Sequence, residues 1–117
     1  MIKIYHNPRC RKSRSGLEYL KQKGVDFEVV EYMKKNFTIS GLKELLAKLN
    51  LNPQDIIREQ ETIFKKQFKG RNFTNEEWIK ILIENPCLIK RPIVVKDYKA
   101  IWADPPENIE LLFKAKK

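Results

Sequence analysis

Apolar and polar residues alternate over residues 1–5, which is the pattern of a short β-strand. Residues 11–23 read instead as a helix, because they carry leucines at helical spacing and are followed by Gly24, a typical C-terminal stop. Residues 25–32 are rich in β-branched and aromatic side chains, which favours a second strand. The beginning of the chain therefore predicts a β-α-β unit with parallel strands.

The middle of the chain predicts helices only. Thr38 is a helix cap followed by an apolar stripe with i, i+3, i+4 spacing. Thr74 and Glu77 form a capping box ahead of a second apolar stripe. Shorter helical segments are expected after Asn52-Pro53 and over residues 63–68. We interpret these stripes as core-forming faces rather than binding faces.

The last third of the chain returns to strands. Residues 92–95 and 100–102 flank a short polar turn and predict a hairpin. Asp104 and Glu107 then form the pattern of a capping box for a final helix. The complete order is β-α-β, an inserted helical region, and β-β-α. This order predicts an α/β fold with a mixed sheet, in the arrangement of thioredoxin and glutaredoxin.

The composition adds limits to this prediction. A chain of 117 residues with 42% hydrophobic residues fits a single domain, which we place at residues 1–117. The longest apolar runs are far too short for a membrane span, and the N-terminal residues lack the apolar region of a signal peptide. Two cysteines do not make a disulfide framework, and there is no His/Cys cluster for a metal. We therefore expect a cytoplasmic protein with reduced thiols and no metal.

The positive charge is concentrated at the beginning of the chain. The formal net charge is +9, and residues 1–24 hold seven Lys or Arg but only one Glu. A basic domain can bind nucleic acid, but no base-stacking or DNA-reading motif accompanies these residues, so nucleic acid is not the expected partner. Four basic residues flank Cys10, a cluster that suits a small anion or a thiolate; the alternative is a solvated basic face. These four are Arg9, Arg11, Lys12 and Arg14.

Cys10 is the candidate nucleophile. It lies between a predicted strand and the start of a predicted helix, where free N–H groups and nearby cations lower a thiol pKa. Ser13 makes the motif CxxS, so a redox cycle needs a second thiol from another molecule. Ser13 itself either caps the helix or hydrogen-bonds to the thiolate. Cys87 lies in an apolar stretch, and we interpret it as a packed, unreactive cysteine.

Two arginines outside this cluster are further candidates. Arg91 precedes Pro92 at the entry of a predicted strand, and this X-Pro bond is cis or trans. Arg58 interrupts an otherwise apolar face. Each guanidinium is suited to an oxyanion, although an arginine taken alone is more often a surface residue paired with a neighbouring carboxylate.

Taken together, the motifs resemble those of the glutaredoxin-linked arsenate reductases, over roughly residues 2–113. The resemblance rests on two motifs about 80 residues apart, and this pairing is more specific than CxxS alone. The motifs are Tyr5-His6-Asn7-Pro8-Arg9-Cys10 followed by Ser13-Arg14, and Asn85-Pro86 leading to Arg91-Pro92-Ile93-Val94-Val95.

The resemblance implies a thioredoxin-like fold with a cis-proline at Pro92. It further implies that Cys10 attacks arsenate, that His6 lies close to it, and that arginines hold the oxyanion. Glutathione and glutaredoxin would be the reductants, and no cofactor would be bound. The residues that we accordingly expect at the oxyanion are Arg58, Arg91, Ser13 and Arg14.

One position departs from the family pattern. The family has a third arginine where this chain has Asp104, which either faces the anion or only caps the final helix. Two alternative functions therefore stay open. One is a regulator of the Spx type that binds RNA polymerase, although the CxxC switch of that group is absent. The other is a glutathione-dependent thiol oxidoreductase with a different substrate, such as glutathione mixed disulfides.

Overall fold

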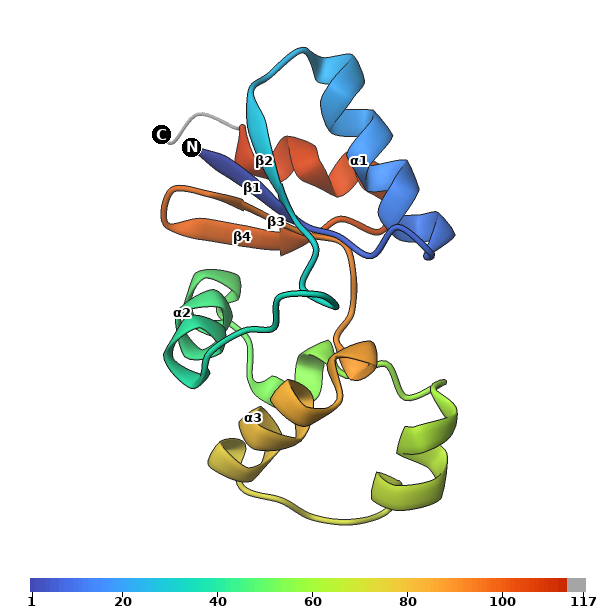
Figure 1. Cartoon of the computed structure of the whole chain (residues 1–117). Helices are drawn as coiled ribbons and strands as arrows, with labels where there is room; N and C mark the ends of the chain where they lie inside the picture. Colours follow the sequence, from blue (N-terminus) through green and yellow to red (C-terminus); the bar gives the residue numbers. More distant parts are fainter. Residues whose placement is uncertain (114–117) are drawn as a thin grey trace. The chain divides into compact units, whose positions relative to one another are not determined.

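The computed structural model describes residues 1–113 and divides the chain into two compact units (Figure 1). Unit 1 comprises Met1–Lys35 and residues 91–113, and unit 2 is Asn36–Lys90. Within residues 1–113, every strand of the sheet belongs to unit 1, and unit 2 is built from helices and turns. Residues 1–113 thus comprise a sheet-containing unit and an inserted helical unit, and the single domain at residues 1–117 stays a prediction.

Unit 1 is organised around a four-stranded sheet. Its strands are β1 (Ile2–Tyr5), β2 (Phe27–Val30), β3 (Ile93–Lys96) and β4 (Lys99–Trp102), in the order β2-β1-β3-β4. β1 pairs parallel with β2 and antiparallel with β3, and β3 pairs antiparallel with β4. The expected mixed sheet is therefore confirmed. β1 is one of its two inner strands, and the helical connection between β1 and β2 allows them to pair in parallel.

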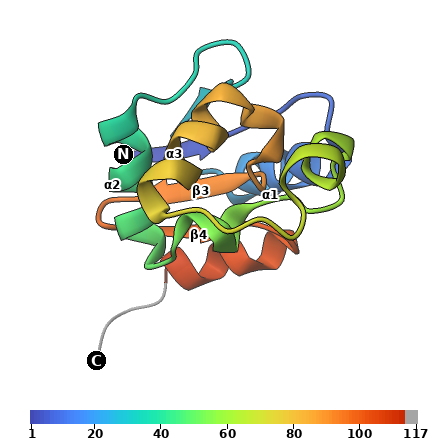
Figure 2. The same cartoon turned by 90° about the horizontal axis from the view of Figure 1, so that it is seen from below.

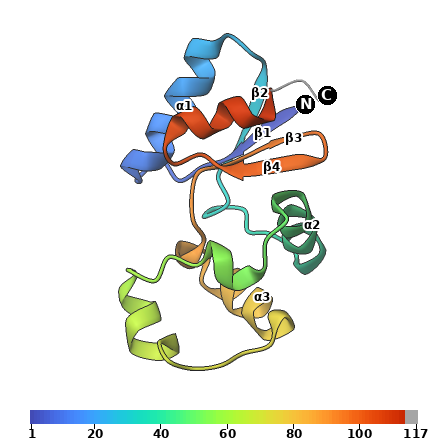
Figure 3. The ribbon, with the colours of Figure 1, turned by 180° about the vertical axis from the view of Figure 1, so that it is seen from behind.

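Two helices cover one face of this sheet (Figures 1 and 3). They are α1 (Arg11–Lys23) and the 3-10 helix η4 (Pro106–Leu112). α1 ends at Gly24, which has φ 76, a left-handed conformation that glycine adopts without steric cost. The core between the helices and the sheet consists of Ile2, Ile4, Leu20, Val94, Ala103, Ile109 and Leu112.

The final helix begins differently from the sequence-based expectation. The predicted capping box of Asp104 and Glu107 is wrong, because the N-cap of η4 is Pro105 and no side chain caps it. The Asp104–Pro105 peptide bond is cis, and the helix starts only at Pro106. The carboxylate of Asp104 is consequently available for another partner.

Unit 2 consists of α2 (Ile39–Leu49) and α3 (Asn75–Glu84), which contact each other, and of three short turns (Figures 1 and 2). The predicted caps are confirmed. Thr38 accepts a hydrogen bond of 3.0 Å from the Gly41 N–H, and Thr74 accepts one of 3.2 Å from the Glu77 N–H. The short turns are η1 (Pro53–Ile56), the π-helical turn η2 (Phe64–Phe68) and η3 (Pro86–Leu88).

The apolar stripes of unit 2 form its core. Leu42 and Leu45 of α2 and Ile79 and Leu82 of α3 are all buried, as the helical spacing predicted. An aromatic cluster extends this core, with ring centroids 4.8 Å to 6.5 Å apart for the contacts that include Trp78. The cluster contains Phe64, Phe68, Phe73 and Trp78.

Candidate active site

Cys10 is the N-cap residue of α1, directly after the loop that leaves β1. Its backbone N–H donates to the carbonyl of Asn7 at 3.0 Å, and its carbonyl accepts the first helical hydrogen bond from Arg14, also at 3.0 Å. The thiol is free and partly buried. The turn before Cys10 and the helix after it therefore hold the sulfur at the positive end of the helix.

The surroundings of Cys10 favour the thiolate. Partial burial alone raises the pKa of the thiol, but the backbone N–H of Ser13 and the guanidinium of Arg91 outweigh it, with a further contribution from the Lys12 N–H. The pKa of Cys10 is therefore lowered. A thiolate with a lowered pKa and partial exposure has the properties of a reactive cysteine rather than a structural one.

The hydroxyl of Ser13 hydrogen-bonds to the loop before Cys10 and does not cap the N-terminus of α1. It accepts a hydrogen bond of 2.9 Å from the Asn7 N–H and lies 2.7 Å from Nδ1 of His6. Ser13 is completely buried and His6 is only 4% exposed. The interpretation of its side chain as a simple helix cap is therefore wrong, because the cap position belongs to Cys10. Ser13 instead fixes the loop through its hydroxyl and acts on Cys10 through its N–H.

The surroundings of His6 lower its pKa, which favours the neutral imidazole. Burial lowers the pKa of the imidazole, and the opposing effects of the Glu31 carboxylate and the Ser13 hydrogen bond do not restore it. Nδ1 of the ring and the Ser13 hydroxyl share a hydrogen bond whose donor depends on the imidazole tautomer. His6 therefore belongs to the network that shapes the Cys10 loop.

Two further hydrogen bonds hold the loop before Cys10. The Asn7 side-chain oxygen accepts from the Arg9 N–H at 3.1 Å, and the Arg14 guanidinium donates to the carbonyl of Pro8 at 2.9 Å. We expected Arg14 at the oxyanion. One of its N–H groups instead donates to the loop, and its side chain is exposed. Asn7 was missed as a site residue, although an Asn before Pro at a strand end is a common turn signal.

Arg91 comes to the site from the second chain segment of unit 1, which begins at this residue. The Arg91–Pro92 peptide bond is cis, which confirms the cis-proline expected at Pro92. Arg91 is 8% exposed, its side chain hydrogen-bonds to Cys10, and its carbonyl accepts a hydrogen bond of 3.2 Å from the Trp102 indole. A buried guanidinium beside a thiolate is suited to hold a negatively charged substrate there.

The helix bearing Cys10 packs closely against this proline. A Cβ added at Gly16 of α1 would lie 2.6 Å from Cγ of Pro92 and 3.8 Å from the side chain of Ala103. The Ala103 N–H in turn donates to the Pro92 carbonyl at 2.9 Å. Glycine at position 16 therefore permits the approach that brings Arg91 to Cys10.

Asp104 also faces the Cys10 end of α1. Its carboxylate lies 3.0 Å from the Nζ atom of Lys12. The interpretation of Asp104 as a helix cap is excluded, because Pro105 is the N-cap of η4. The ion pair places the Asp104 carboxylate beside Lys12, two positions after Cys10. Sequence spacing alone contains no signal for this pair.

The remaining candidates lie in unit 2. The guanidinium of Arg58 pairs with the Glu61 carboxylate at 2.8 Å, the kind of local ion pair that the sequence left open as its alternative. Cys87 is a free, partly buried cysteine within η3. The assignment of Arg58 to an oxyanion stays a prediction.

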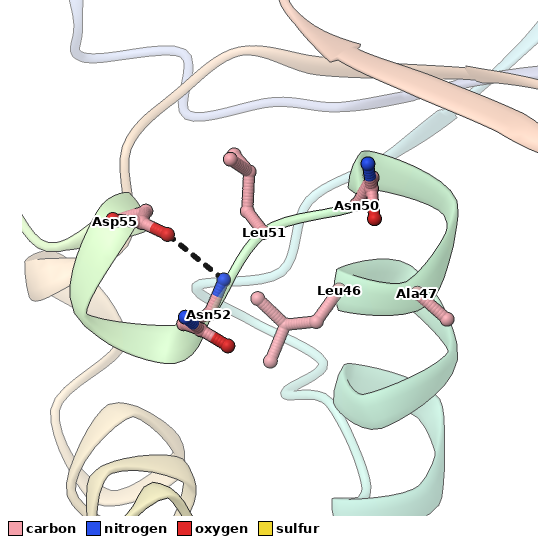
Figure 4. A pocket seen from close by; sticks show the side chains of 6 residues that line it. All are labelled: Leu46, Ala47, Asn50, Leu51, Asn52 and Asp55. Carbon is pink, nitrogen blue, oxygen red and sulfur yellow. Dashed lines mark hydrogen bonds between the residues drawn. The ribbon is translucent and has the colours of Figure 1, made fainter.

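Unit 2 also contains a pocket of its own, shown in Figure 4. Its polar groups serve the local backbone: Asn50 ends α2 in a left-handed conformation, and Asp55 accepts a hydrogen bond of 2.9 Å from the Asn52 N–H. These contacts explain the polar lining by helix capping, and we assign the pocket no function. Its lining residues are Leu46, Ala47, Asn50, Leu51, Asn52 and Asp55.

Residues 1–113 hold neither a metal-ligand cluster nor a membrane-spanning helix. This part of the chain contains no group of three or more His, Cys, Asp or Glu side chains placed to hold a metal ion. None of its helices has the length and apolar character needed to cross a membrane.

Comparison with known proteins places the chain in a family. The sequence pattern of the ArsC family matches residues 5–112. The chain is 37% identical over 111 residues to an arsenate reductase of Neisseria meningitidis serogroup B, covering 93% of this chain and 95% of the relative. It is 39% identical over 110 residues to the protein YfgD of Escherichia coli K12, covering 92% of each.

A solved structure supports the same assignment. The arsenate reductase from Vibrio cholerae superimposes with a TM-score of 0.90 at 33% identity, covering 95% of this chain and 96% of that one. This similarity confirms the expected thioredoxin-like α/β fold. On the matched sequence pattern, the relatives and the fold, the chain belongs to the ArsC family.

Proposed function

We propose that this protein reduces arsenate by thiol chemistry at Cys10, with glutathione and glutaredoxin as the reductants. The observation that carries the proposal is the surroundings of the Cys10 thiol. It lies at the N-terminal end of α1 and has a pKa lowered by the Ser13 N–H and the Arg91 guanidinium, against the effect of its partial burial. The same donors that stabilise a thiolate also stabilise negative charge on an oxyanion bound next to it.

The first step uses the thiolate as a nucleophile. The sulfur of Cys10 attacks the arsenic of arsenate, an S–As bond forms, and one oxygen leaves as water after protonation. Arg91 holds the oxyanion and offsets the charge that develops during the attack. Ser13 and His6 keep the loop and the helix start in position while the bond forms. The family resemblance assigns Arg58 to the oxyanion as well.

The second step removes arsenic in its reduced form. A glutathione thiol loses its proton and attacks the Cys10 sulfur of the adduct. The S–As bond breaks, and a disulfide forms between Cys10 and glutathione. The two electrons released by this S–S bond formation reduce arsenic from the pentavalent to the trivalent state, and arsenite leaves. Glutaredoxin then reduces the mixed disulfide and restores the Cys10 thiol. Residue 13 is a serine and cannot form a disulfide with Cys10, so the scheme uses glutathione for the second thiol and only one thiol from this chain.

The test measures arsenite formed from arsenate in the presence of glutathione, with and without glutaredoxin. We expect activity that requires both reductants, is abolished in Cys10→Ser and is retained for the most part in Cys87→Ser. Cys87→Ser is the matched control, because it removes the other thiol by the same substitution. Equal loss in both variants, with both still folded, would contradict the monothiol scheme. A wild-type protein without arsenite formation would contradict the proposed function.

A further inference from the structure

The ion pair between Lys12 and Asp104 lies at the edge of the Cys10 site. The Lys12 ammonium and the Asp104 carboxylate are 3.0 Å apart, with side chains 56% and 23% exposed. Lys12 stands two positions after Cys10, and its backbone N–H helps to lower the pKa of the thiol. The pair thus adds a carboxylate to a corner of unit 1 whose other groups favour negative charge.

The backbone around Asp104 is held on both sides. The Ala103 N–H donates to the Pro92 carbonyl at 2.9 Å, which ties the preceding residue to the cis-proline. The Asn108 amide donates to the carbonyls of Asp104 and Trp102 at 3.3 Å and 3.2 Å. The position of the Asp104 main chain therefore follows from the fold, and its side chain reaches Lys12 from a fixed point.

Such a pair has a larger effect on the site than on stability. A salt bridge of this exposure contributes little to folding stability. Its effect on an incoming anion is twofold: the carboxylate occupies the ammonium of Lys12, and it repels negative charge. An oxyanion that approaches Cys10 finds the cation of Lys12 already neutralised.

We infer that Asp104 is a specificity-determining residue, which withholds Lys12 from oxyanions and so weakens their binding at the Cys10 site. This inference rests on the proposed function, whose substrate is an oxyanion. It concerns binding and not the thiol chemistry, since neither side chain of the pair hydrogen-bonds to the Cys10 sulfur in the interactions that set its pKa. Asp104 therefore acts on KM for arsenate and leaves kcat nearly unchanged.

The first arm of the test replaces the carboxylate by its isosteric amide. Asp104→Asn should lower KM for arsenate about fivefold, the effect of roughly 1 kcal/mol from one partly exposed charge. Asp97→Asn is the matched control, because it makes the same charge change at another paired aspartate of unit 1, in the β3–β4 turn. A KM that falls equally in both variants would assign the effect to net charge and overturn the inference.

The second arm asks whether Lys12 is the cation that is released. Lys12→Gln alone should raise KM, because it leaves the Asp104 carboxylate unpaired and free to repel the anion. In the Asp104→Asn background it should raise KM about fivefold and cancel the gain. If Lys12→Gln leaves the low KM of the Asp104→Asn protein unchanged, Asp104 does not act through Lys12 and the inference is overturned.

A binding measurement separates this inference from the proposed function. Inorganic arsenate that occupies the site should protect Cys10 from iodoacetamide, whether or not turnover follows. Half-protection at about fivefold lower arsenate in Asp104→Asn than in wild type or Asp97→Asn supports the inference even in a protein that forms no arsenite. Turnover in wild type, with unchanged protection and KM in Asp104→Asn, supports the proposed function and overturns the inference.

Discussion

The hydrogen bonds that stabilise unit 1 differ in sequence range from those at the helix ends of unit 2. In unit 2, the hydrogen bonds at the helix ends join residues three positions apart, as at Thr38 with Gly41 and Thr74 with Glu77. In unit 1, the decisive contacts join the two ends of the chain. The Tyr19 hydroxyl and the Lys23 ammonium both donate to the carboxylate of Glu110, 91 and 87 positions away.

The candidate site follows the pattern of unit 1. Cys10 and Lys12 come from the beginning of the chain, and their partners Arg91 and Asp104 come from its last third. A site of this kind exists only when the sheet and both helices of unit 1 have formed. Unit 2 also has long-range contacts, such as the backbone hydrogen bonds from Arg58 to Leu88 and from Lys90 to Ile56, but it supplies none of these four residues. The chemistry at Cys10 therefore depends on packing between distant parts of the chain within unit 1.

The largest expected effect on stability is at the contact between α1 and the cis-proline. Gly16→Ala places a Cβ 2.6 Å from the Pro92 ring, so the helix must move, and we expect a loss of about 1–3 kcal/mol in the free energy of unfolding. Denaturant unfolding measures this loss, and reactivity of Cys10 with iodoacetamide shows whether the site is displaced as well.

Gly41→Ala in α2 is the matched control for this substitution. Its new Cβ would meet only the Thr38 hydroxyl, at 3.0 Å, and alanine favours a helix over glycine by about 1 kcal/mol. We expect a change within about 1 kcal/mol and no effect on Cys10. A loss at Gly41 as large as that at Gly16 would break the contrast between the two units.

A smaller effect is expected from a cap in unit 2. Thr74→Ala removes the oxygen that accepts from the Glu77 N–H and should cost about 1 kcal/mol of unfolding free energy. Ser15→Ala, at an exposed position of α1, is the control and should be nearly neutral. Loss of Cys10 reactivity in Thr74→Ala under native conditions would show that the site does not depend on unit 1 alone.

The smallest effect concerns His6, the only histidine in the chain. Burial lowers its pKa below the ordinary value of 6.5, so the unfolded chain takes up this proton at a higher pH than the folded one does. The resulting stabilisation is complete above pH 6.5 and declines as the pH falls through 6.5 toward the lower folded pKa. A single imidazole titration by NMR reads the folded value, and a pKa at or above 6.5 would contradict the neutral, buried state.

Much of the fold follows from sequence pattern alone, because helices, caps and short strands depend mainly on residues close together in the sequence. The strand of residues 1–5, the helix 11–23 and the caps Thr38 and Thr74 depend on neighbours a few positions away, and each is confirmed. The ends of a strand depend on pairing with its neighbour. The strand expected at residues 25–32 is shorter in the structure, Phe27–Val30, because only those residues pair with β1.

The site was predictable only where the family resemblance supplied long-range information. Cys10 followed from its basic neighbours and the helix start, and the cis Arg91–Pro92 bond followed from the resemblance. The cap assigned to Asp104 was wrong because a capping pattern says nothing about a lysine 92 positions earlier that competes for the same carboxylate. The loop role of the Ser13 hydroxyl was missed for the same reason, since the fold of the loop decides its partners.

The most direct test of the account is the pH dependence of Cys10 alkylation. In Cys87→Ser, which leaves a single thiol, the rate of reaction with iodoacetamide should have its midpoint at a lower pH in the folded protein than in the same protein unfolded by denaturant. Arg91→Gln should move the folded midpoint upward, because it removes the guanidinium that stabilises the thiolate. A folded midpoint equal to or above the unfolded one would contradict an activated Cys10, and with it the proposed function.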